Sequence, residues 1–311
     1  MVLNEMNNGT YTAIVTPRDD NLNIDYDKLR ELVDKQVDGG VAGLVVMGTT
    51  GESSYIDSPG SIGRSSYRRM IETVRNQADR SGRHVPIIAG ICAPYVSEVV
   101  EKTRVARDCG ADAGLLTAVP YVKQRQNGIQ NYFLSVADNG SLPIVVYDVE
   151  SRVGTSIEPK TLESLAKHDK IIAIKAATGD MIRIKDYVQV AYGSNFTRDN
   201  KFKVFSGDDA TTHLAIQEGA SGGVSVISNV APRMWSQLVN YCLEKDPEAG
   251  DLLGKMIPMC ELSMKYGNPM TIKEMMKING FDVGFCIGEL GYLEPSEVGY
   301  VMDKLSGVEL E

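Results

Sequence analysis

Eight short apolar runs, spaced along the first three quarters of the chain, constrain the fold more than any other feature of this sequence. Each run is nearly continuous in apolar residues, which is typical of strands covered on both faces in a parallel sheet, and the intervals of roughly 20 to 40 residues leave room for a crossover helix. The runs are YTAIVTP from Tyr11, GLVVMG from Gly43, VPIIAG from Val85, AGLLTAV from Ala113, LPIVVYD from Leu142, IIAIKAA from Ile171, KVFSGDD from Lys203 and GGVSVIS from Gly222. Eight strand–helix units in sequence predict a (β/α)8 TIM barrel rather than an open doubly wound sheet.

The segments between the runs carry the end signals of helices. DYDKLRELVDKQVDGG begins on an acidic cap candidate, Asp25, and ends at Gly39. From about Pro232 the remaining chain is predicted to be helical, with segments RMWSQLVNYCLEKD, AGDLLGKMIPMCELSMKYG, PMTIKEMMKING and PSEVGYVMDKLSG. We therefore predict a barrel over residues 1–231 that carries the active site, and a C-terminal helical extension over residues 232–311.

The charge balance bears on the class of partner. The chain has 32 Lys and Arg against 41 Asp and Glu, a net charge of −9, and no basic run. This balance disfavours a nucleic acid or an anionic membrane as the partner. The sequence has no stretch of about 20 apolar residues, and its first residues lack the pattern of a secretory signal. We expect a cytoplasmic protein that acts on a small molecule.

The cysteines and histidines do not form a metal-binding pattern. The five cysteines, an odd number, are widely spaced and include no Cys-x-x-Cys pair, so we expect them to be reduced core residues. With only three histidines, a histidine-rich metal site is hard to assemble. We expect chemistry without a metal ion or other cofactor.

Polar residues at the ends of the predicted strands form a chemically coherent set. Barrel active sites lie at the carboxyl ends of the strands. The second run leads into GTTGESS, where Thr49, Thr50 and the backbone around Gly51 suit a carboxylate. The fifth predicted strand ends at Tyr147, and the sixth ends at Lys175. Because these two strands are neighbours, Tyr147 and Lys175 are expected to face the same cavity.

A lysine at the end of a buried strand needs a reason, because an ammonium group is costly to bury. Desolvation favours the neutral amine, whose characteristic reaction is imine formation with a carbonyl. Tyr147 and Thr49 have the hydroxyl groups for a proton relay, and Arg152, in YDVESRVG, is suited to bind a carboxylate. The set indicates a class I aldolase site for a 2-oxo acid.

Each residue of this set also has a structural interpretation. A lysine can extend its amine to solvent, a strand-end Tyr or Thr is often a packing residue, and GTTGE suits an ordinary turn. SGDDAT, from Ser206 to Thr211, is expected mainly to leave a strand and cap the next helix. The joint pattern is far more specific than any one member.

Several motifs occur in an order and spacing that match a known family. They are AIVTP, GTTGESS, AVPYVKQRQNG, LPIVVYDVESRVG, IIAIKAATGD, FSGDDAT, GGVSVISNVAP and NPMTIK. On these motifs, which span most of the chain, the sequence resembles the dihydrodipicolinate synthase and N-acetylneuraminate lyase family of pyruvate-dependent class I aldolases. The resemblance implies Lys175 as the Schiff-base lysine, Tyr147 as the proton-transferring tyrosine and Thr49 as the relay threonine. It also implies that Thr50 binds the pyruvate carboxylate and that Val224 contacts pyruvate.

Arg152 bears on the branch of the family. It resembles the arginine with which the synthase branch binds the carboxylate of aspartate semialdehyde. The synthases of this branch act in lysine and diaminopimelate biosynthesis. The aldolases of N-acetylneuraminate and 2-keto-3-deoxy sugar acids generally lack it, and they are the alternative. Asp148 replaces the usual Asn, Glu150 the usual Pro, and Ala176 a common Glu, which keeps that alternative open because these changes affect pocket polarity.

The resemblance further implies a homo-oligomer, a dimer of dimers, in which a tyrosine from a neighbouring subunit completes the relay. The family has a Pro-Tyr-Tyr stretch at this point, whereas this chain has a single tyrosine in VPYVK. An alignment on the downstream QNG places Tyr121 at the catalytic position, and an alignment on Pro120 places Val122 there. We favour Tyr121.

Inhibition by lysine, common in the synthases, is expected to be weak in this protein. Glu98 matches a family ligand of lysine, but Pro94 stands where an asparagine would hydrogen-bond it.

Two further classes of protein are less consistent with the residues. A barrel that only binds a 2-oxo acid, without catalysis, would be expected to have lost part of the lysine, tyrosine and threonine set. A metal-dependent class II aldolase would need histidines at the strand ends, and the three histidines do not lie there.

Overall fold

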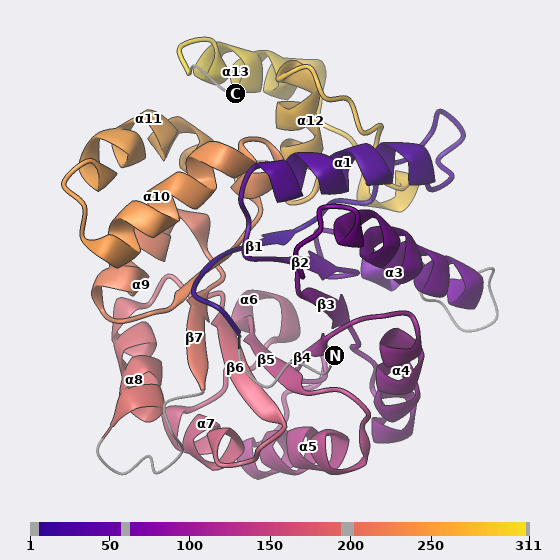
Figure 1. Cartoon of the computed structure of the whole chain (residues 1–311), viewed down its shortest axis with the longest axis vertical. Coiled ribbons are helices and arrows are strands. Elements are labelled where there is room, and N and C mark those ends of the chain that lie inside the picture. The colour runs from indigo at the N-terminus through magenta and orange to yellow at the C-terminus, as the bar shows by residue number, and fades with distance from the viewer. Residues whose placement is uncertain (1–5, 57–62, 194–201, 309–311) are drawn as a thin grey trace. The chain divides into compact units, whose positions relative to one another are not determined.

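Eight parallel strands form a closed barrel in chain order in this computed structural model, which describes residues 6–56, 63–193 and 202–308 (Figure 1). The strands are β1 (Gly9–Ala13), β2 (Gly43–Val46), β3 (Ile87–Gly90), β4 (Ala113–Thr117), β5 (Ile144–Asp148), β6 (Ile171–Ala176), β7 (Lys203–Ser206) and β8 (Gly222–Ser225). Each lies within or beside one of the eight apolar runs, so the barrel prediction is confirmed.

Helices alternate with the strands and continue beyond the last one. The α-helices are α1 (Tyr26–Asp38), α2 (Ser53–Ile56), α3 (Gly63–Asp79), α4 (Val96–Asp108), α5 (Gln126–Asn139), α6 (Glu150–Val153), α7 (Pro159–Ala166), α8 (Met181–Tyr192), α9 (Thr212–Gln217), α10 (Pro232–Glu244), α11 (Ala249–Leu262), α12 (Met270–Ile278) and α13 (Pro295–Leu305). Short 3₁₀ helices are η1 (Asp209–Thr211), η2 (Ile227–Asn229) and η3 (Gly288–Leu290). The Asp25 carboxylate caps α1 as expected, accepting bonds from the amides of Asp27 and Lys28, and Gly39 is the C-cap residue of α1.

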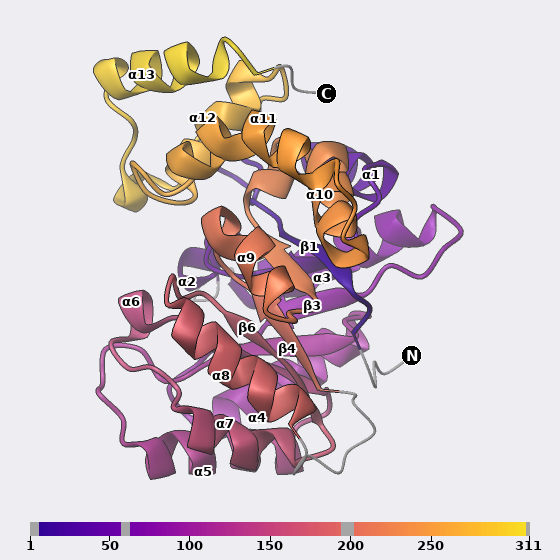
Figure 2. The same ribbon diagram turned by 90° about the vertical axis from the view of Figure 1, so that its left-hand side faces the viewer.

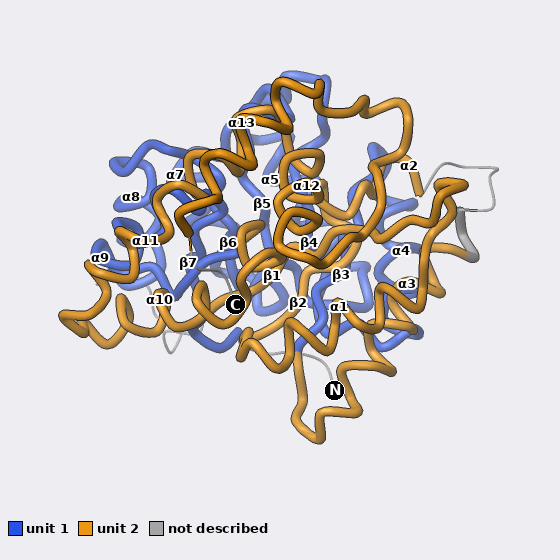
Figure 3. Tube along the Cα trace, turned by 90° about the horizontal axis from the view of Figure 1, so that it is seen from above, with its two compact units in different colours: residues 1–9, 86–224 blue, residues 10–85, 225–311 orange. Residues whose placement is uncertain are grey.

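Contacts within the chain divide it into two compact units, coloured separately in Figure 3. Unit 1 comprises residues 1–9 and 86–224, and unit 2 comprises residues 10–85 and 225–311. The predicted boundary at residues 231 and 232 separates the barrel from its extension, which is a different kind of division, and it stays a prediction.

Unit 1 contains the strands from β3 to β7 and most of β8. Its strands pair in register: Leu115 of β4 is the partner of Val145 in β5, and Ile174 of β6 that of Val204 in β7. The helices α5, α7 and α8 pack side by side along this run of strands, as Figures 1 and 2 show. The strand residues are almost all buried, which explains their apolar composition.

Unit 2 combines β1 and β2 with the C-terminal helices. Tyr11 of β1 pairs with Gly43 of β2, and α1 packs against α3 and α10. Asn229 of η2 connects this short helix to the end of β1, because its side chain accepts from the Val15 amide and donates to the Ala13 carbonyl. The helices α11 and α12 each contact α13, and all three lie together in Figure 2.

The cysteines only partly match the expectation of core residues. Cys109, Cys260 and Cys286 are buried, whereas Cys92 is exposed and Cys242 is half-buried. All five are free thiols. Within the described residues, no helix has the length and apolar character that crossing a membrane would require.

Candidate active site

Lys175 and Tyr147 lie together at the carboxyl ends of adjacent strands. They are direct register partners between β6 and β5, so their side chains project from the same face of the sheet. The Lys175 Nζ atom is 4.3 Å from the centre of the Tyr147 ring. Lys175 is 5% exposed and Tyr147 is 7% exposed. The structure thus brings together, in a buried place, the amine and the phenol that the sequence indicated.

Gly207 provides the space that the Lys175 side chain occupies. It follows β7 and donates its amide hydrogen to the Ala176 carbonyl. A Cβ atom at Gly207 would lie 2.9 Å from Lys175 Cε, 2.9 Å from Ala177 Cβ and 3.1 Å from Ala177 Cα. These separations are shorter than non-bonded carbon contacts of about 3.5–4.0 Å. A glycine is therefore required next to the lysine.

The next residue, Asp208, confirms the capping role expected of the SGDDAT segment. Its carboxylate accepts from the Ala210 amide and from the Thr211 hydroxyl, and Asp208 is the N-cap residue of η1, which leads into α9.

Three other predicted site residues of unit 1 lie in different environments. Val224 is buried in β8. Arg152 has an exposed side chain on the single-turn helix α6, which ends at Gly154 in the left-handed conformation. Tyr121 lies in the loop between β4 and α5, is fully exposed and has a φ of 72°. An aromatic residue with positive φ is a rare and strained case, so this loop holds Tyr121 outward at an energetic cost.

Asp148 faces away from Tyr147, because consecutive strand residues point to opposite faces. Its Oδ1 accepts from the Ile157 amide at 3.0 Å, and its Oδ2 lies 2.7 Å from the Tyr187 hydroxyl. That hydroxyl also contacts the Ile157 carbonyl. Burial is the main cause that raises the pKa of Asp148 above its usual range. The single hydrogen of the Tyr187 hydroxyl therefore faces two acceptors, the Asp148 carboxyl group and the Ile157 carbonyl.

The substitutions noted at Asp148 and Ala176 are register partners. At this register position β5 therefore carries a carboxyl group, on Asp148, and β6 carries none. Both Asp148 oxygens are hydrogen-bonded, one to the Ile157 amide and one to the Tyr187 hydroxyl. The carboxyl group at position 148 is thus accommodated on the face opposite Tyr147.

The predicted threonines lie in a tight turn after β2, in unit 2. The Gly51 amide donates to the Gly48 carbonyl, and the Glu52 amide donates to the Thr49 carbonyl. Thr49 is half-buried and Thr50 is buried. A Cβ at Gly51 would lie 3.2 Å from the Met47 nitrogen, which accounts for the glycine. We call residues 48–51 the threonine loop.

Two residues that are not glycine flank the threonine loop with positive φ angles. Met47 has a φ of 59° and Glu52 a φ of 57°. Each such conformation costs about 1–3 kcal/mol and persists only where the surrounding structure over-determines it. The predicted relay from Tyr147 to Thr49 joins residues of different units and stays a prediction.

Sequence reasoning assigned no role to Glu52, Lys273 or Asn268, although GTTGESS and NPMTIK were both quoted as motifs. Lys273 offered a signal, because it lies on the buried face of α12 between Ile272 and Met276. Asn268 donates to the Thr50 hydroxyl oxygen at 2.9 Å, a contact 218 residues apart in sequence that no local pattern reveals.

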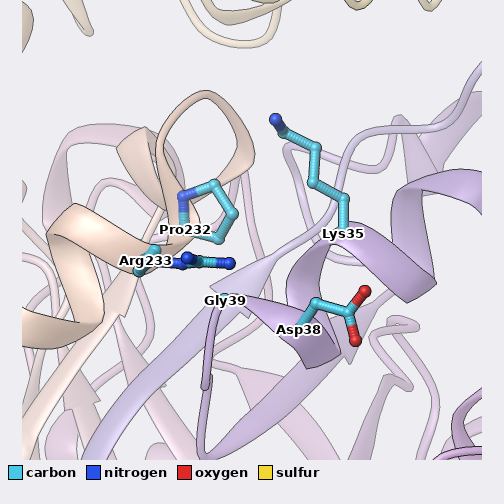
Figure 4. A pocket seen from close by; sticks show the side chains of 5 residues that line it. All are labelled: Lys35, Asp38, Gly39, Pro232 and Arg233. Atoms are coloured by element: carbon cyan, nitrogen blue, oxygen red, sulfur yellow. The ribbon is translucent and has the colours of Figure 1, made fainter. Parts of the chain in front are cut away.

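A surface hollow elsewhere in unit 2 contains no predicted site residue. It lies where the end of α1 meets the start of α10, and Figure 4 shows Pro232 and Arg233 facing Gly39 there, with Lys35 and Asp38 at its rim. A Cβ at Gly39 would lie 2.6 Å from Pro232 Cβ, so this is a place of close helix packing.

Comparison with known proteins gives consistent results. The model of the dihydrodipicolinate synthetase family matches residues 6–304. A 4-hydroxy-tetrahydrodipicolinate synthase of Methanothrix thermoacetophila is 33% identical over 277 residues, which cover 89% of this chain and 88% of the relative. Another, of Haloarcula marismortui, is 33% identical over 304 residues, covering 97% and 94%. The crystal structure of the chloride-inhibited dihydrodipicolinate synthase from Acinetobacter baumannii complexed with pyruvate superposes with a TM-score of 0.87 at 29% identity, covering 96% of this chain and 98% of that one.

Proposed function

Since the chain belongs to the dihydrodipicolinate synthetase family, we propose that it catalyses the 4-hydroxy-tetrahydrodipicolinate synthase reaction, the condensation of pyruvate with L-aspartate 4-semialdehyde. It is a lyase of the pyruvate-dependent class I aldolase type. The observation that carries the proposal is the buried pair of Lys175 and Tyr147 at the ends of adjacent strands.

The Lys175 amine attacks the ketone carbon of pyruvate and forms an imine, with loss of water. Removal of a methyl proton then gives an enamine, whose carbon adds to the aldehyde carbon of the second substrate. Proton transfers in these steps need a group within hydrogen-bond reach. Tyr147, whose ring lies against the lysine, is the proposed donor and acceptor, with Thr49 as its relay partner.

The remaining contacts hold the substrates. The hydroxyl of Thr50 and the backbone at Gly51 bind the pyruvate carboxylate, and Val224 contacts pyruvate with its apolar side chain. The exposed guanidinium of Arg152 binds the carboxylate of aspartate semialdehyde in a bidentate pair. Arg152 is the residue that favours this substrate over a sugar acid.

Tyr121 completes the relay from a second copy of the chain. Its full exposure and positive φ support this role, because the strained loop presents the phenol away from its own barrel. The active form is accordingly a homo-oligomer, a dimer of dimers. The expected location in the cytoplasm stays a prediction.

Borohydride trapping tests the chemistry. Pyruvate with borohydride is expected to label Lys175 irreversibly, and Lys175→Ala is expected to abolish the label. Lys170→Ala is a matched control, because Lys170 is exposed immediately before the same strand, β6. A peptide map that places the adduct on another lysine, or finds none, refutes the proposed lysine.

A substrate comparison tests the branch. Aspartate semialdehyde, N-acetylneuraminate and 2-keto-3-deoxygluconate are assayed at one enzyme concentration. We expect turnover with aspartate semialdehyde and pyruvate, and loss of most of it in Arg152→Ala with little change in pyruvate trapping. Preferred cleavage of either sugar acid would instead establish the alternative activity.

A further inference from the structure

A buried cluster of charges lies directly behind the threonine loop, within unit 2. Arg18, Glu52 and Lys273 are each at most 7% exposed. The Arg18 Nε donates to Glu52 Oε2 at 2.9 Å, and Lys273 Nζ lies 2.7 Å from Glu52 Oε1. Two cations therefore share one carboxylate in a place from which solvent is excluded, an arrangement that is a poor source of net stability.

Lys273 also contacts two backbone carbonyls. Its Nζ donates to the Thr16 carbonyl at 2.7 Å and to the Phe285 carbonyl at 2.9 Å. Together with the ion pair to the Glu52 carboxylate, these two hydrogen bonds give the ammonium group three partners. The lysine is thus oriented by three fixed partners, two of which lie against the threonine loop.

Those two partners hold the same end of the threonine loop. Thr16 donates from its hydroxyl to the Gly51 carbonyl at 2.7 Å, and Glu52 is the residue that follows Gly51. Glu52 adopts the left-handed backbone conformation described above, and its Oε2 accepts from the Ile287 amide at 3.0 Å. The strained exit of the loop is held by bonds to its side chain, not by local sequence preference.

We infer that Lys273 is a positioning residue for catalysis: through Thr16 and Glu52 it fixes the loop that presents Thr49 and Thr50. The inference rests on the proposed function of these two threonines. It gives α12 of the C-terminal helices a role in the reaction, although Lys273 itself contacts no reacting atom.

The cluster has two cations and one carboxylate, and this imbalance decides which residue is best replaced. Lys273→Met removes one cation and leaves Arg18 and Glu52 as a neutral pair, whereas a change at Glu52 would leave two buried cations facing each other. Lys277→Met is the matched control, because Lys277 lies one turn later on α12 and is exposed.

Thr16→Val provides a second, milder test should Lys273→Met fail to fold. It removes only the hydroxyl that holds the Gly51 carbonyl. Thr12→Val is its control: Thr12 is equally buried, and its hydroxyl donates at 2.7 Å to the Gln36 side chain instead of the loop. The two valine variants lose the same type of bond, so a difference between them reports on the loop.

The experiment measures proton exchange per active site. Purified full-length variants are titrated with pyruvate and borohydride to count competent lysines, and the exchange of pyruvate methyl protons in D₂O is followed by NMR without a second substrate. We expect exchange per titrated site to fall about 10- to 100-fold in Lys273→Met and several-fold in Thr16→Val, since displacements near 1 Å cost about that much. The two controls should stay within about twofold of the wild type on the same reasoning.

The outcomes separate the two claims. Wild-type chain that forms no pyruvate adduct overturns the proposed function and the inference with it. If the wild-type chain forms the adduct but exchange per site in Lys273→Met equals that of its control, the inference alone is overturned. If Lys273→Met does not fold, the same comparison is made between Thr16→Val and its control. A loss of activity that only follows the number of titratable sites shows a purely structural role and also overturns it.

Discussion

Replacement of Gly207 by alanine is expected to damage the site from a position that carries no functional group. The added Cβ would stand 2.9 Å from Lys175 Cε, and it would also meet Ala177 Cβ at 2.9 Å and Ala177 Cα at 3.1 Å. The lysine can rotate away, but Ala177 belongs to the backbone segment that leaves β6 and has no flexible side chain to move. Relief of the clash therefore moves either the strand exit or the lysine.

The magnitude follows from these two routes. Overpacking of a well-packed site typically costs about 1–3 kcal/mol of unfolding free energy. Displacement of the Lys175 amine by about 1 Å lowers the rate of imine formation by up to about 100-fold, or about 2.7 kcal/mol in the barrier. We expect both effects, with the loss in rate exceeding the loss in folded protein.

Gly179→Ala is the matched control for this change. Gly179 lies in the loop after the same strand, and the nearest atom to its added Cβ is Asp208 Oδ2 at 3.9 Å, an ordinary contact. Urea unfolding, borohydride trapping and steady-state turnover are measured for both variants. Wild-type trapping and turnover in Gly207→Ala would show that the lysine does not need this space, and would refute the reasoning.

Four further predictions concern pH, the relay, assembly and regulation. Because the folded pKa of Asp148 is raised above its usual 3.8, protonation stabilises the fold at low pH, and this contribution is lost as the pH rises through the folded pKa. Asp148→Asn should remove that loss, so the free energy of unfolding in urea, taken as variant minus wild type, should grow from about pH 4 upward. A difference in unfolding free energy that does not change with pH would contradict this. Tyr147→Phe should keep the pyruvate adduct while turnover falls about 100-fold or more, and unchanged turnover would exclude a proton-transfer role. Mixed Lys175→Ala and Tyr121→Phe subunits, each inactive alone, should regain partial activity after exchange; exchange without activity excludes action across an interface. Millimolar lysine should inhibit little at saturating pyruvate, because Pro94 offers no hydrogen bond where a ligand contact is expected; half-inhibition below about 1 mM, a binding free energy near −4.1 kcal/mol, would contradict this.

The order and type of the elements followed from local sequence. The apolar runs matched the eight strands because a strand of a parallel sheet is buried on both faces and must be apolar along its length. The cap of α1 at Asp25 was predictable for a similar reason, since a carboxylate before a helix satisfies amides only a few residues away.

Some features of the candidate site could likewise be predicted from local sequence, and others could not. Lys175 and Tyr147 could be placed together because neighbouring strands end at one edge, so a one-dimensional pattern sufficed. The role of Asp148 could not be predicted, because its environment depends on where Tyr187 of α8 packs. The expectation that all cysteines are core residues was wrong for Cys92 and Cys242, whose exposure depends on loop and helix placement.

By itself the sequence determined the barrel and the family, and it singled out Lys175 as the proposed reactive amine, since each depends on periodicity or on motifs a few residues long. Only the tertiary structure decided what supports the threonine loop. Lys273 donates to Thr16, a residue 257 positions earlier, and both lie in a unit assembled from the two ends of the chain. No local pattern encodes such a contact, because the partners of the buried ammonium group surround it only after α12 has packed.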